Sequence, residues 1–223
     1  SPPPPSPRRV PPTDTITPSI PVIIAYGDSL VEGWGLPERE ALPAQLEAAL
    51  LRAGTTVREV TFGAAGETAP EGLERLPKVL EAKPVAVILE FGANDCYQGI
   101  PVEETEAALA AMATGLIEAG VKVLVAGWRT EEDLFSRYAD DPDLVGMLPI
   151  APPLYNAEYV RRFNQLHPEL AQRLNLPLIP HILDPIGEDA RYYQADAVHP
   201  NAAGSIILAD SLVPWLLPML EGA

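Results

Sequence analysis

The sequence predicts an α/β fold in which helices cover both faces of a parallel β-sheet. From residue 22 onward, short apolar runs alternate with longer segments that carry apolar residues at helical spacing. Three of the short runs are apolar enough to be strands buried on both faces, which is the pattern of a parallel sheet. Repeated strand–helix units of this kind are joined by right-handed crossovers, so we expect the strands to run side by side in one direction.

We expect five strands and five main helices in one domain that spans residues 22–223. The strands are expected at residues 22–26, 57–62, 85–91, 121–127 and 176–181. The helices are expected at residues 38–53, 70–82, 102–119 and 155–174, with a last one after Pro200 and Asn201. A chain of 223 residues is long enough for one substantial hydrophobic core and short for two.

Residues 1–21 differ in composition from the rest of the chain. They contain nine prolines and too few large apolar residues for a core, which predicts an extended, polyproline-like leader or linker with little order. The chain starts at Ser1 rather than at Met, so we expect that an upstream segment was removed, either a signal peptide or an expression tag. A periplasmic or secreted location fits this leader, with the cytoplasm as the alternative.

Residues 128–153 break the rhythm of strands and helices. Six acidic residues follow the fourth expected strand, and the segment ends in a proline-rich stretch. Loops of this length in compact domains are usually functional or disordered. Two interpretations stay open: a solvated surface excursion, or a lid or pocket wall, because the segment leaves the carboxyl end of a strand.

The charge of the chain excludes several kinds of partner. Acidic residues outnumber basic ones by 31 to 15, for a formal net charge of −16, which repels phosphate backbones and anionic lipid surfaces. Nucleic acid is therefore not an expected partner.

No apolar run approaches the roughly 18 to 20 residues that cross a bilayer, so we expect no stable membrane insertion. We take a monomer as the default.

Polar residues gather directly after the expected strands and near the C-terminus. In open parallel sheets the ligand crevice lies beyond the carboxyl ends of the strands, so residues at these ends can meet. The relevant segments are Gly27-Asp28-Ser29-Leu30, Gly63-Ala64-Ala65-Gly66-Glu67-Thr68, Gly92-Ala93-Asn94-Asp95 and Asp196-Ala197-Val198-His199-Pro200-Asn201.

These segments contain each group that acyl transfer requires: a nucleophile, a base, an orienting partner for the base, and donors for the oxyanion. Ser29 follows a strand and a glycine, so its hydroxyl is presented at the sheet edge. Asp196 precedes His199 by three residues, so its carboxylate folds back, holds Nδ1–H and leaves Nε2 to face the serine. Gly66 offers an unobstructed backbone N–H, and Asn94 offers a neutral amide donor.

The same segments resemble the sequence blocks of the SGNH (GDSL-type) hydrolases, from about residue 22 to the C-terminus. Within that family the chain is most similar to bacterial arylesterases and acyl thioesterase/lysophospholipase enzymes. The run Gly-Asp-Ser-Leu-Val-Glu-Gly-Trp-Gly resembles the first block, Gly66 matches the second, Asn94 the third, and Asp196 with His199 the last. The resemblance implies Ser29 as nucleophile and Ser29, Gly66 and Asn94 as the oxyanion hole. It also implies a three-layer α/β/α sandwich with a five-stranded parallel sheet of flavodoxin-like type.

Two departures limit what this resemblance implies. Ala93 stands where this branch commonly has glycine, a small change that we expect to narrow the pocket. The segment 128–153 is longer than the equivalent loop of the compact thioesterase-like members, so their substrate range is not transferred.

Other reactive side chains have plainer interpretations. Cys96 is the only cysteine, which excludes an intrachain disulfide, and we expect it to be a small buried residue. His167 and His181 are expected to be core or surface residues, and Asp28 and Asp95 to brace the turns they occupy. Because neither histidine lies near a cluster of metal-ligand residues, we expect no metal. Neither a dinucleotide-binding glycine motif nor a P-loop lysine is present, so we expect no nucleotide and no other cofactor. The absence of Gly-x-Ser-x-Gly around Ser29 argues against the nucleophile elbow of α/β-hydrolases.

The sequence therefore predicts a serine esterase that cleaves neutral short- to medium-chain acyl or aryl esters through an acyl-enzyme on Ser29. Because His199 must be neutral to accept a proton, activity is expected to rise as the pH increases through the titration of the imidazole. A carbohydrate acetylesterase or an acyltransferase with the same triad is the first alternative. A non-catalytic binding module tethered by the leader is the second.

Overall fold

The computed structural model describes residues 20–130 and 157–222. Its centre is one parallel sheet of five strands in the order β2-β1-β3-β4-β5. The strands are β1 (Val22–Gly27), β2 (Arg58–Gly63), β3 (Ala86–Glu90), β4 (Lys122–Ala126) and β5 (Leu178–Ile179). This order is that of flavodoxin-like folds and confirms the predicted fold class.

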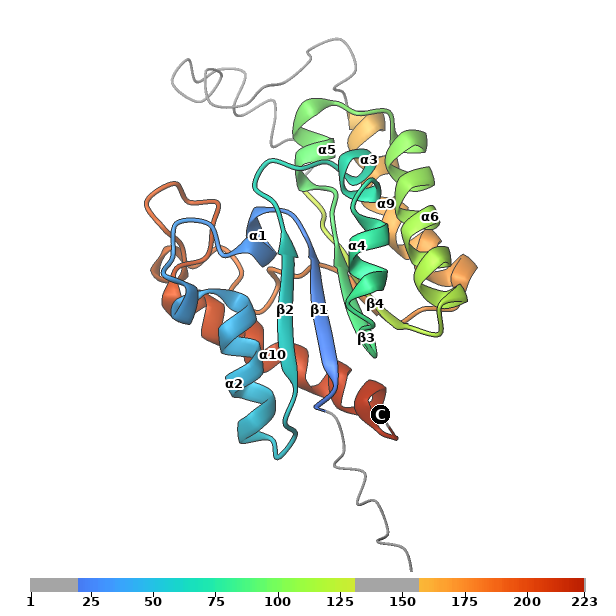
Figure 1. Cartoon of the computed structure of the whole chain (residues 1–223). Helices are drawn as coiled ribbons and strands as arrows, with labels where there is room; N and C mark the ends of the chain where they lie inside the picture. Colours follow the sequence, from blue (N-terminus) through green and yellow to red (C-terminus); the bar gives the residue numbers. More distant parts are fainter. Residues whose placement is uncertain (1–19, 131–156, 223) are drawn as a thin grey trace, which may run out of the picture.

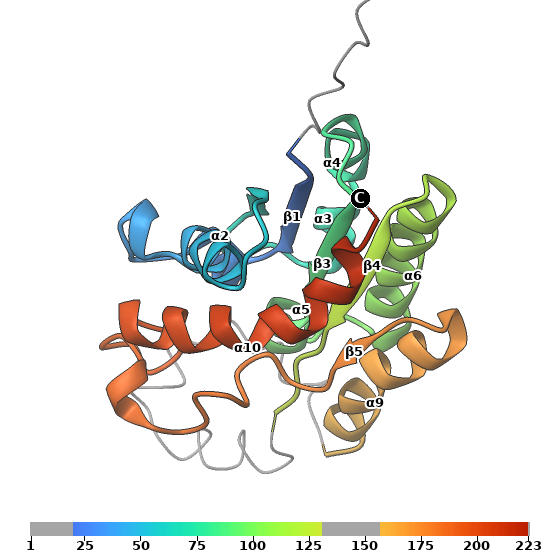
Figure 2. The same cartoon turned by 90° about the horizontal axis from the view of Figure 1, so that it is seen from below.

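Helices cover both faces of the sheet, as Figures 1 and 2 show. One face carries α2 (Leu42–Arg52) and α10 (Ala202–Leu220), and the other carries α3 (Ala69–Leu73), α4 (Leu76–Glu81), α6 (Val102–Glu118) and α9 (Ala157–Leu174). Two short helices begin where strands end, α1 (Ser29–Glu32) after β1 and α5 (Ala93–Gln98) after β3. Two 3-10 turns complete the described elements, η1 (Glu38–Glu40) and η2 (Ala190–Tyr192).

Strand β1 shows how the sheet separates two hydrophobic cores. Ile23 and Ala25 pack into the core beneath α2 and α10, whereas Ile24 and Tyr26 pack into the core beneath α3, α6 and α9. All four side chains are buried, and successive side chains of a strand point to opposite faces. A strand buried on both faces therefore reads as a continuous apolar run in the sequence.

Prolines divide two of the expected helices. The expected helix 70–82 consists of α3 and α4, and the expected helix 38–53 consists of η1 and α2. Pro43, Pro70 and Pro77 each lie in the first turn of a helix. Proline has no N–H to donate and its ring clashes with the preceding turn, so it begins a helix more readily than it continues one. The single-helix expectations were wrong for this reason.

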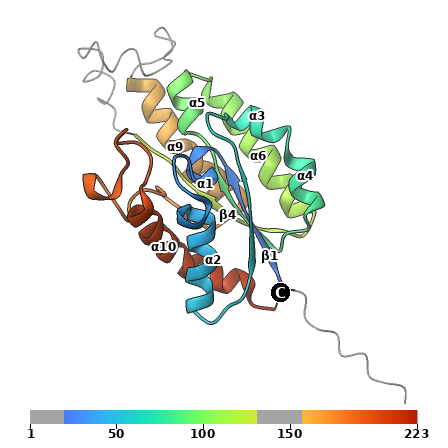
Figure 3. The same cartoon turned by 60° about the vertical axis from the view of Figure 1, so that its left-hand side comes forward.

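Helix α10 corrects the expectation about apolar runs. With 19 residues and a mean hydropathy of 1.6, it is long and apolar enough to cross a membrane by length and composition alone. In the fold it lies against α2 and the sheet, as Figure 3 shows. Its buried residues are Gly204, Ser205, Leu208, Ala209, Leu212, Leu216, Met219 and Leu220. An apolar composition is also what a helix needs when it contributes to a core.

Two predictions fall outside the described residues. Of the proline-rich leader 1–21, only residues 20 and 21 are described, and of the segment 128–153, only residues 128–130.

Candidate active site

Ser29 is placed at the carboxyl edge of the sheet by the junction of β1 and α1. The side chain of Asp28 caps α1 by accepting a hydrogen bond from the N–H of Leu30 at 3.0 Å. Gly27, the residue before Asp28, must lack a side chain, because a Cβ there would lie 2.1 Å from the carbonyl oxygen of Glu90. Strand β1 therefore approaches β3 closely at its end, and Ser29 is the first residue of the helix that follows.

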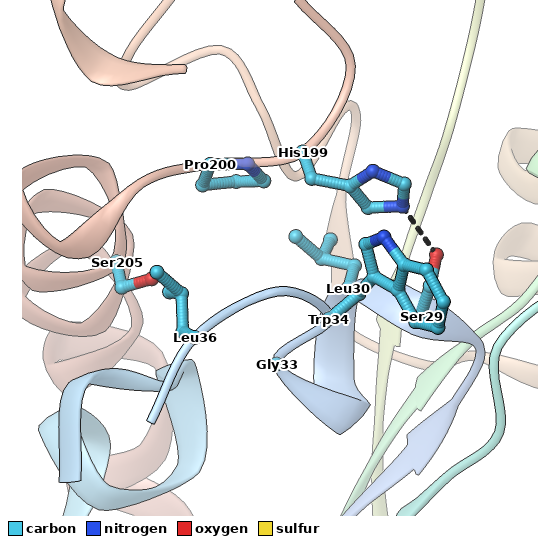
Figure 4. A pocket seen from close by; sticks show the side chains of 8 residues that line it. All are labelled: Ser29, Leu30, Gly33, Trp34, Leu36, His199, Pro200 and Ser205. Atoms are coloured by element: carbon cyan, nitrogen blue, oxygen red, sulfur yellow. Dashed lines mark hydrogen bonds between the residues drawn. The ribbon is translucent and has the colours of Figure 1, made fainter. Parts of the chain in front are cut away.

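His199 and Asp196 meet Ser29 from a loop that precedes α10. Ser29 Oγ lies 2.9 Å from His199 Nε2 (Figure 4), and His199 Nδ1 lies 2.7 Å from Asp196 Oδ2. The other carboxylate oxygen of Asp196 accepts hydrogen bonds from the N–H groups of Val198 and His199, both at 3.0 Å. Ala197 has a positive φ of 56°, which forms the tight turn between the two side chains. The structure thus brings together the three residues that the sequence singled out.

The charge on Asp196 follows from its surroundings. Partial burial acts to raise the pKa of this carboxyl group, but hydrogen bonds from the side chain and N–H of His199 and the N–H of Val198 outweigh burial, so the net shift is downward. Asp196 is therefore ionised at neutral pH and accepts a hydrogen bond from Nδ1–H of His199. This bond fixes the tautomer that leaves the lone pair of Nε2 directed at Ser29.

The expected oxyanion donors differ in their availability. The backbone N–H groups of Ser29 and Gly66 donate to no acceptor in the parts of the chain that the structure describes. Gly66 has a positive φ of 77°, a conformation that favours glycine. The amide of Asn94, in contrast, donates to Asp28 Oδ2 at 3.1 Å and to the carbonyl of Glu67 at 3.0 Å. An anionic oxygen would compete with these two acceptors for the Asn94 amide.

A pair of buried carboxyl groups lies next to the nucleophile. The side chains of Asp28 and Glu90 are hydrogen-bonded to each other, and each residue is at most 3% exposed. Burial raises the pKa of both groups, and it raises that of Glu90 well above the ordinary range. Glu90 is therefore neutral and donates to Asp28, which remains the acceptor for Leu30 and Asn94. The sequence analysis missed Glu90, whose signal is an acidic residue inside an apolar strand.

Two further polar residues support the loops that follow the strands. Asp95 accepts hydrogen bonds from the N–H of Ala69 and the hydroxyl of Thr105 at 2.9–3.1 Å, and burial raises its pKa to about 6. These bonds tie α3 and α6 to α5. Arg75 forms an ion pair with Glu67 and donates to the carbonyl of Phe62 at 2.8 Å. It thereby holds the loop that contains Gly66, and the sequence analysis did not identify it.

Gln194 joins the loop after Ser29 to the loop of His199, and it too was missed. Its Nε2 donates to the carbonyl oxygens of Trp34 at 2.7 Å and of Pro200 at 2.9 Å. Its backbone N–H donates to the carbonyl oxygen of His199 at 2.8 Å. One residue therefore bonds to both of the segments whose separation sets the distance between Ser29 and His199.

The remaining reactive side chains are buried or support the fold. His167 is 1% exposed and bonds through Nε2 to the carbonyl of Phe91, and burial lowers its pKa to about 4. Burial also lowers the pKa of His181 to about 4, so both rings are neutral at pH 7. Cys96 is buried, as expected. Residues 20–130 and 157–222 contain no group of three or more His, Cys, Asp or Glu side chains placed to hold a metal ion.

A serine, a histidine and an aspartate joined by hydrogen bonds in this order are typical of serine hydrolases. Here the three residues lie at the carboxyl edge of the parallel sheet of an α/β/α sandwich. The sequence comparison is more specific. Residues 25–205 match the GDSL-like lipase/acylhydrolase family, and the chain belongs to this family. It is a serine esterase.

Individual relatives match over most of their length. Esterase TesA of Pseudomonas aeruginosa is 29% identical over 199 residues, and the arylesterase of Vibrio mimicus is 26% identical over 199 residues; the match covers 89% of both chains in each case. The crystal structure of AlinE4, an SGNH-hydrolase family esterase, superposes with a TM-score of 0.66 at 31% identity. That match covers 91% of this chain and 97% of the AlinE4 chain.

Proposed function

We propose that Ser29 is the nucleophile of this esterase, that His199 is its general base and that Asp196 orients the base. The observation that carries the proposal is the 2.9 Å contact between Ser29 Oγ and His199 Nε2, with Asp196 bound to the other ring nitrogen. As Oγ attacks the ester carbonyl carbon, Nε2 accepts the serine proton. The tetrahedral intermediate collapses when the same proton passes to the departing alkoxide, which leaves an acyl group on Ser29. Water then repeats the sequence and releases the acid.

The proposed oxyanion hole consists of the N–H groups of Ser29 and Gly66 together with the amide of Asn94. The two backbone donors have no other acceptor among the described residues, so they bind the developing charge without losing an existing bond. Asn94 contributes when a substrate oxygen replaces or shares one of its two present acceptors. The protonated state of Glu90 keeps one negative charge away from this site.

The proposed substrates are neutral esters with short- to medium-chain acyl groups, aryl esters included. The net charge of −16 disfavours highly anionic substrates. The apolar side chains of Leu30, Trp34 and Leu36 line part of the hollow beside Ser29 and His199. The arylesterase of Vibrio mimicus is a relative whose name places it among enzymes for aryl esters.

Replacement of the nucleophile tests the proposed roles. Ser29→Ala is expected to lower kcat for p-nitrophenyl acetate by at least about 10³-fold, because the members of a triad act as a unit. The matched control is Ser211→Ala, which removes a hydroxyl from α10 that binds the carbonyl of Leu208. Labelling with a fluorophosphonate, followed by intact-mass measurement, is expected for the wild type and the control but not for Ser29→Ala. Retention of several per cent of the activity by Ser29→Ala would refute the assignment.

A further inference from the structure

A hollow lies on the His199 side of the nucleophile. It encloses about 200 Å³ of space that opens to solvent, and its walls include Ser29, His199, Leu30, Trp34, Leu36 and Pro200. Figure 4 shows the indole of Trp34 beside the hydroxyl of Ser29 and the ring of His199. The two aromatic rings have centroids 6.2 Å apart and are tilted by 43°. The reacting pair therefore forms one side of the hollow, and Leu30, Trp34, Leu36 and Pro200 supply its apolar walls.

The hollow and the oxyanion donors lie on different sides of Ser29. Leu30 packs into the core beneath α2 and α10, and Ser205 of α10 also lines the hollow. The loops of Gly66 and Asn94 instead lead into α3 and α5, which belong to the opposite face of the sheet (Figures 1 and 3). A carbonyl oxygen directed at these donors thus points away from the hollow.

This geometry assigns the two halves of an ester. In the tetrahedral intermediate, the carbon attacked by Ser29 is bonded to Oγ, to the oxyanion, to the chain of the acyl group and to the alkoxide oxygen. The alkoxide oxygen must receive its proton from His199 Nε2 before it leaves. The alcohol half of the substrate therefore lies beside His199, where the hollow is, and the acyl half takes the remaining direction.

Trp34 is held in place by the chain around it. Gly33 and Gly35, on either side of it, have positive φ values of 83° and 75°. A Cβ on Gly33 would lie 2.2 Å from Ala41 Cβ, and a Cβ on Gly35 would lie 2.2 Å from Gln194 Oε1. The carbonyl of Trp34 accepts the hydrogen bond from Gln194. Trp34 is nevertheless 52% exposed, so a fixed backbone presents a large apolar side chain to solvent beside the base.

We propose that this hollow is the leaving-group subsite of the esterase and that Trp34 makes it favour compact apolar or aromatic alcohols. The inference rests on the proposed function, since it uses His199 as the proton donor to the leaving group. Much of this space is open to solvent, so the enclosed part of the hollow takes a compact group rather than a long chain. No lysine or arginine lines the hollow, and its one basic side chain is His199, whose proton goes to the alkoxide oxygen. A phosphate-bearing alcohol would thus lose hydration there without gaining a partner.

The test holds the acyl group constant and changes the alcohol. Benzyl acetate and ethyl acetate form the same acetyl-enzyme and release alcohols of similar acidity. Trp34→Ala is expected to lower kcat/KM for benzyl acetate by about 10-fold or more, because an aromatic contact and apolar burial are lost. For ethyl acetate we expect a change of less than about 3-fold, because the small alcohol makes little contact with the indole. Trp34→Phe, which keeps an aromatic wall, is expected to restore most of the preference for benzyl acetate.

Two controls make the result decisive. Trp215→Ala removes a tryptophan of similar exposure from α10, outside the hollow, and is expected to leave the benzyl-to-ethyl ratio unchanged. A series of p-nitrophenyl esters from acetate to octanoate varies only the acyl group, and Trp34→Ala is expected to lower all members by a similar factor. A changed chain-length profile with an unchanged benzyl-to-ethyl ratio would instead make the hollow the acyl site and overturn the proposal. Ser29→Ala distinguishes failure of the triad from failure of the subsite. Activity in Ser29→Ala refutes the triad. An inactive Ser29→Ala together with an unchanged benzyl-to-ethyl ratio in Trp34→Ala refutes the subsite alone.

Discussion

Ser29 lies between two carboxyl-containing regions that differ sharply in burial. On one side, Asp196 occupies an exposed loop, with a side chain 35% exposed, and hydrogen bonds from His199 and Val198 lower its pKa against the effect of burial. On the other side, Glu90 is 1% exposed at the end of β3, and burial raises its pKa well above the ordinary range. Two acidic residues close to one nucleophile are thus held in opposite protonation states.

The difference shows how environment divides the work between similar side chains. A carboxylate that must attract the proton of an imidazole is kept ionised by water and by hydrogen-bond donors. A carboxyl group that only has to hold a loop in place is buried and keeps its proton, so it adds no charge near the oxyanion. The exposed side lacks the packing that fixes the buried side, and hydrogen bonds such as those of Gln194 replace it.

The largest effect is expected from replacement of an aspartate near Ser29 by asparagine, and it should differ strongly between Asp196 and Asp28. Asp196→Asn is expected to lower kcat by about 10³- to 10⁴-fold, because a neutral amide does not select the tautomer of His199 that accepts the serine proton. Asp28→Asn is expected to cost less than about 30-fold, because an amide oxygen still accepts the bond from Leu30, whereas the contact with Asn94 is lost.

Steady-state turnover of p-nitrophenyl acetate by both variants measures this contrast, with Asp184→Asn, an aspartate that pairs with Arg129 at the surface, as the control. If Asp28→Asn were the more damaging change, the acid of the triad would have to be reassigned to Asp28.

The sequence predicted the fold and the candidate residues that follow β1, β2 and β3 because both have local signals. Buried parallel strands are continuous apolar runs, and the carboxyl-edge rule selects the residues after them. The residues it missed act through partners far away in the chain: Gln194 bonds to Trp34 across 160 positions, Glu90 to Asp28 across 62, and Arg75 to Phe62 across 13. Neither composition nor periodicity contains such pairings.

The short helices were missed for a related reason. Helix α1 has four residues and α5 has six, which is too short for an apolar repeat of 3.6 residues to become visible. Both begin in segments that the sequence presented as glycine-containing turns. Each helix nevertheless contains a site residue, Ser29 in α1 and Asn94 in α5. These two candidate residues could therefore be selected from the sequence, but the helices that hold them could not.

A smaller effect is expected from Gln194, which tests whether hydrogen bonds alone hold the exposed side. Gln194→Leu removes both side-chain bonds at similar volume and is expected to lower kcat/KM by about 10- to 50-fold, since a displacement of about 1 Å at a catalytic group is costly. The matched control is Gln45→Leu, because Gln45 also donates through Nε2 to a backbone carbonyl, that of Arg39, at 2.7 Å.

The strongly downfield proton resonance expected for the Nδ1–H of His199 gives an independent readout. We expect it to weaken or disappear in Gln194→Leu and to persist in Gln45→Leu. An unchanged resonance together with wild-type kcat/KM would show that the loop of His199 keeps its position without Gln194.

The smallest effect on catalysis is expected from Glu90, and it appears mainly in stability. The native state holds the proton of Glu90 at a higher pH than the unfolded chain, in which the pKa is near 4.5. Between these two values the folded protein binds more protons, so its stability falls as the pH rises.

Glu90→Gln removes this dependence and still donates an N–H to Asp28, so kcat at pH 7 is expected to stay within about 5-fold of wild type. Thermal unfolding between pH 5 and pH 8 measures the effect, and the wild-type Tm is expected to fall by several degrees more than that of the variant. Glu104→Gln makes the same substitution on the exposed face of α6 and is expected to keep the wild-type slope. Parallel Tm profiles for wild type and Glu90→Gln would mean that Glu90 is ionised in the folded protein, and the contrast between the two sides of Ser29 would then be lost.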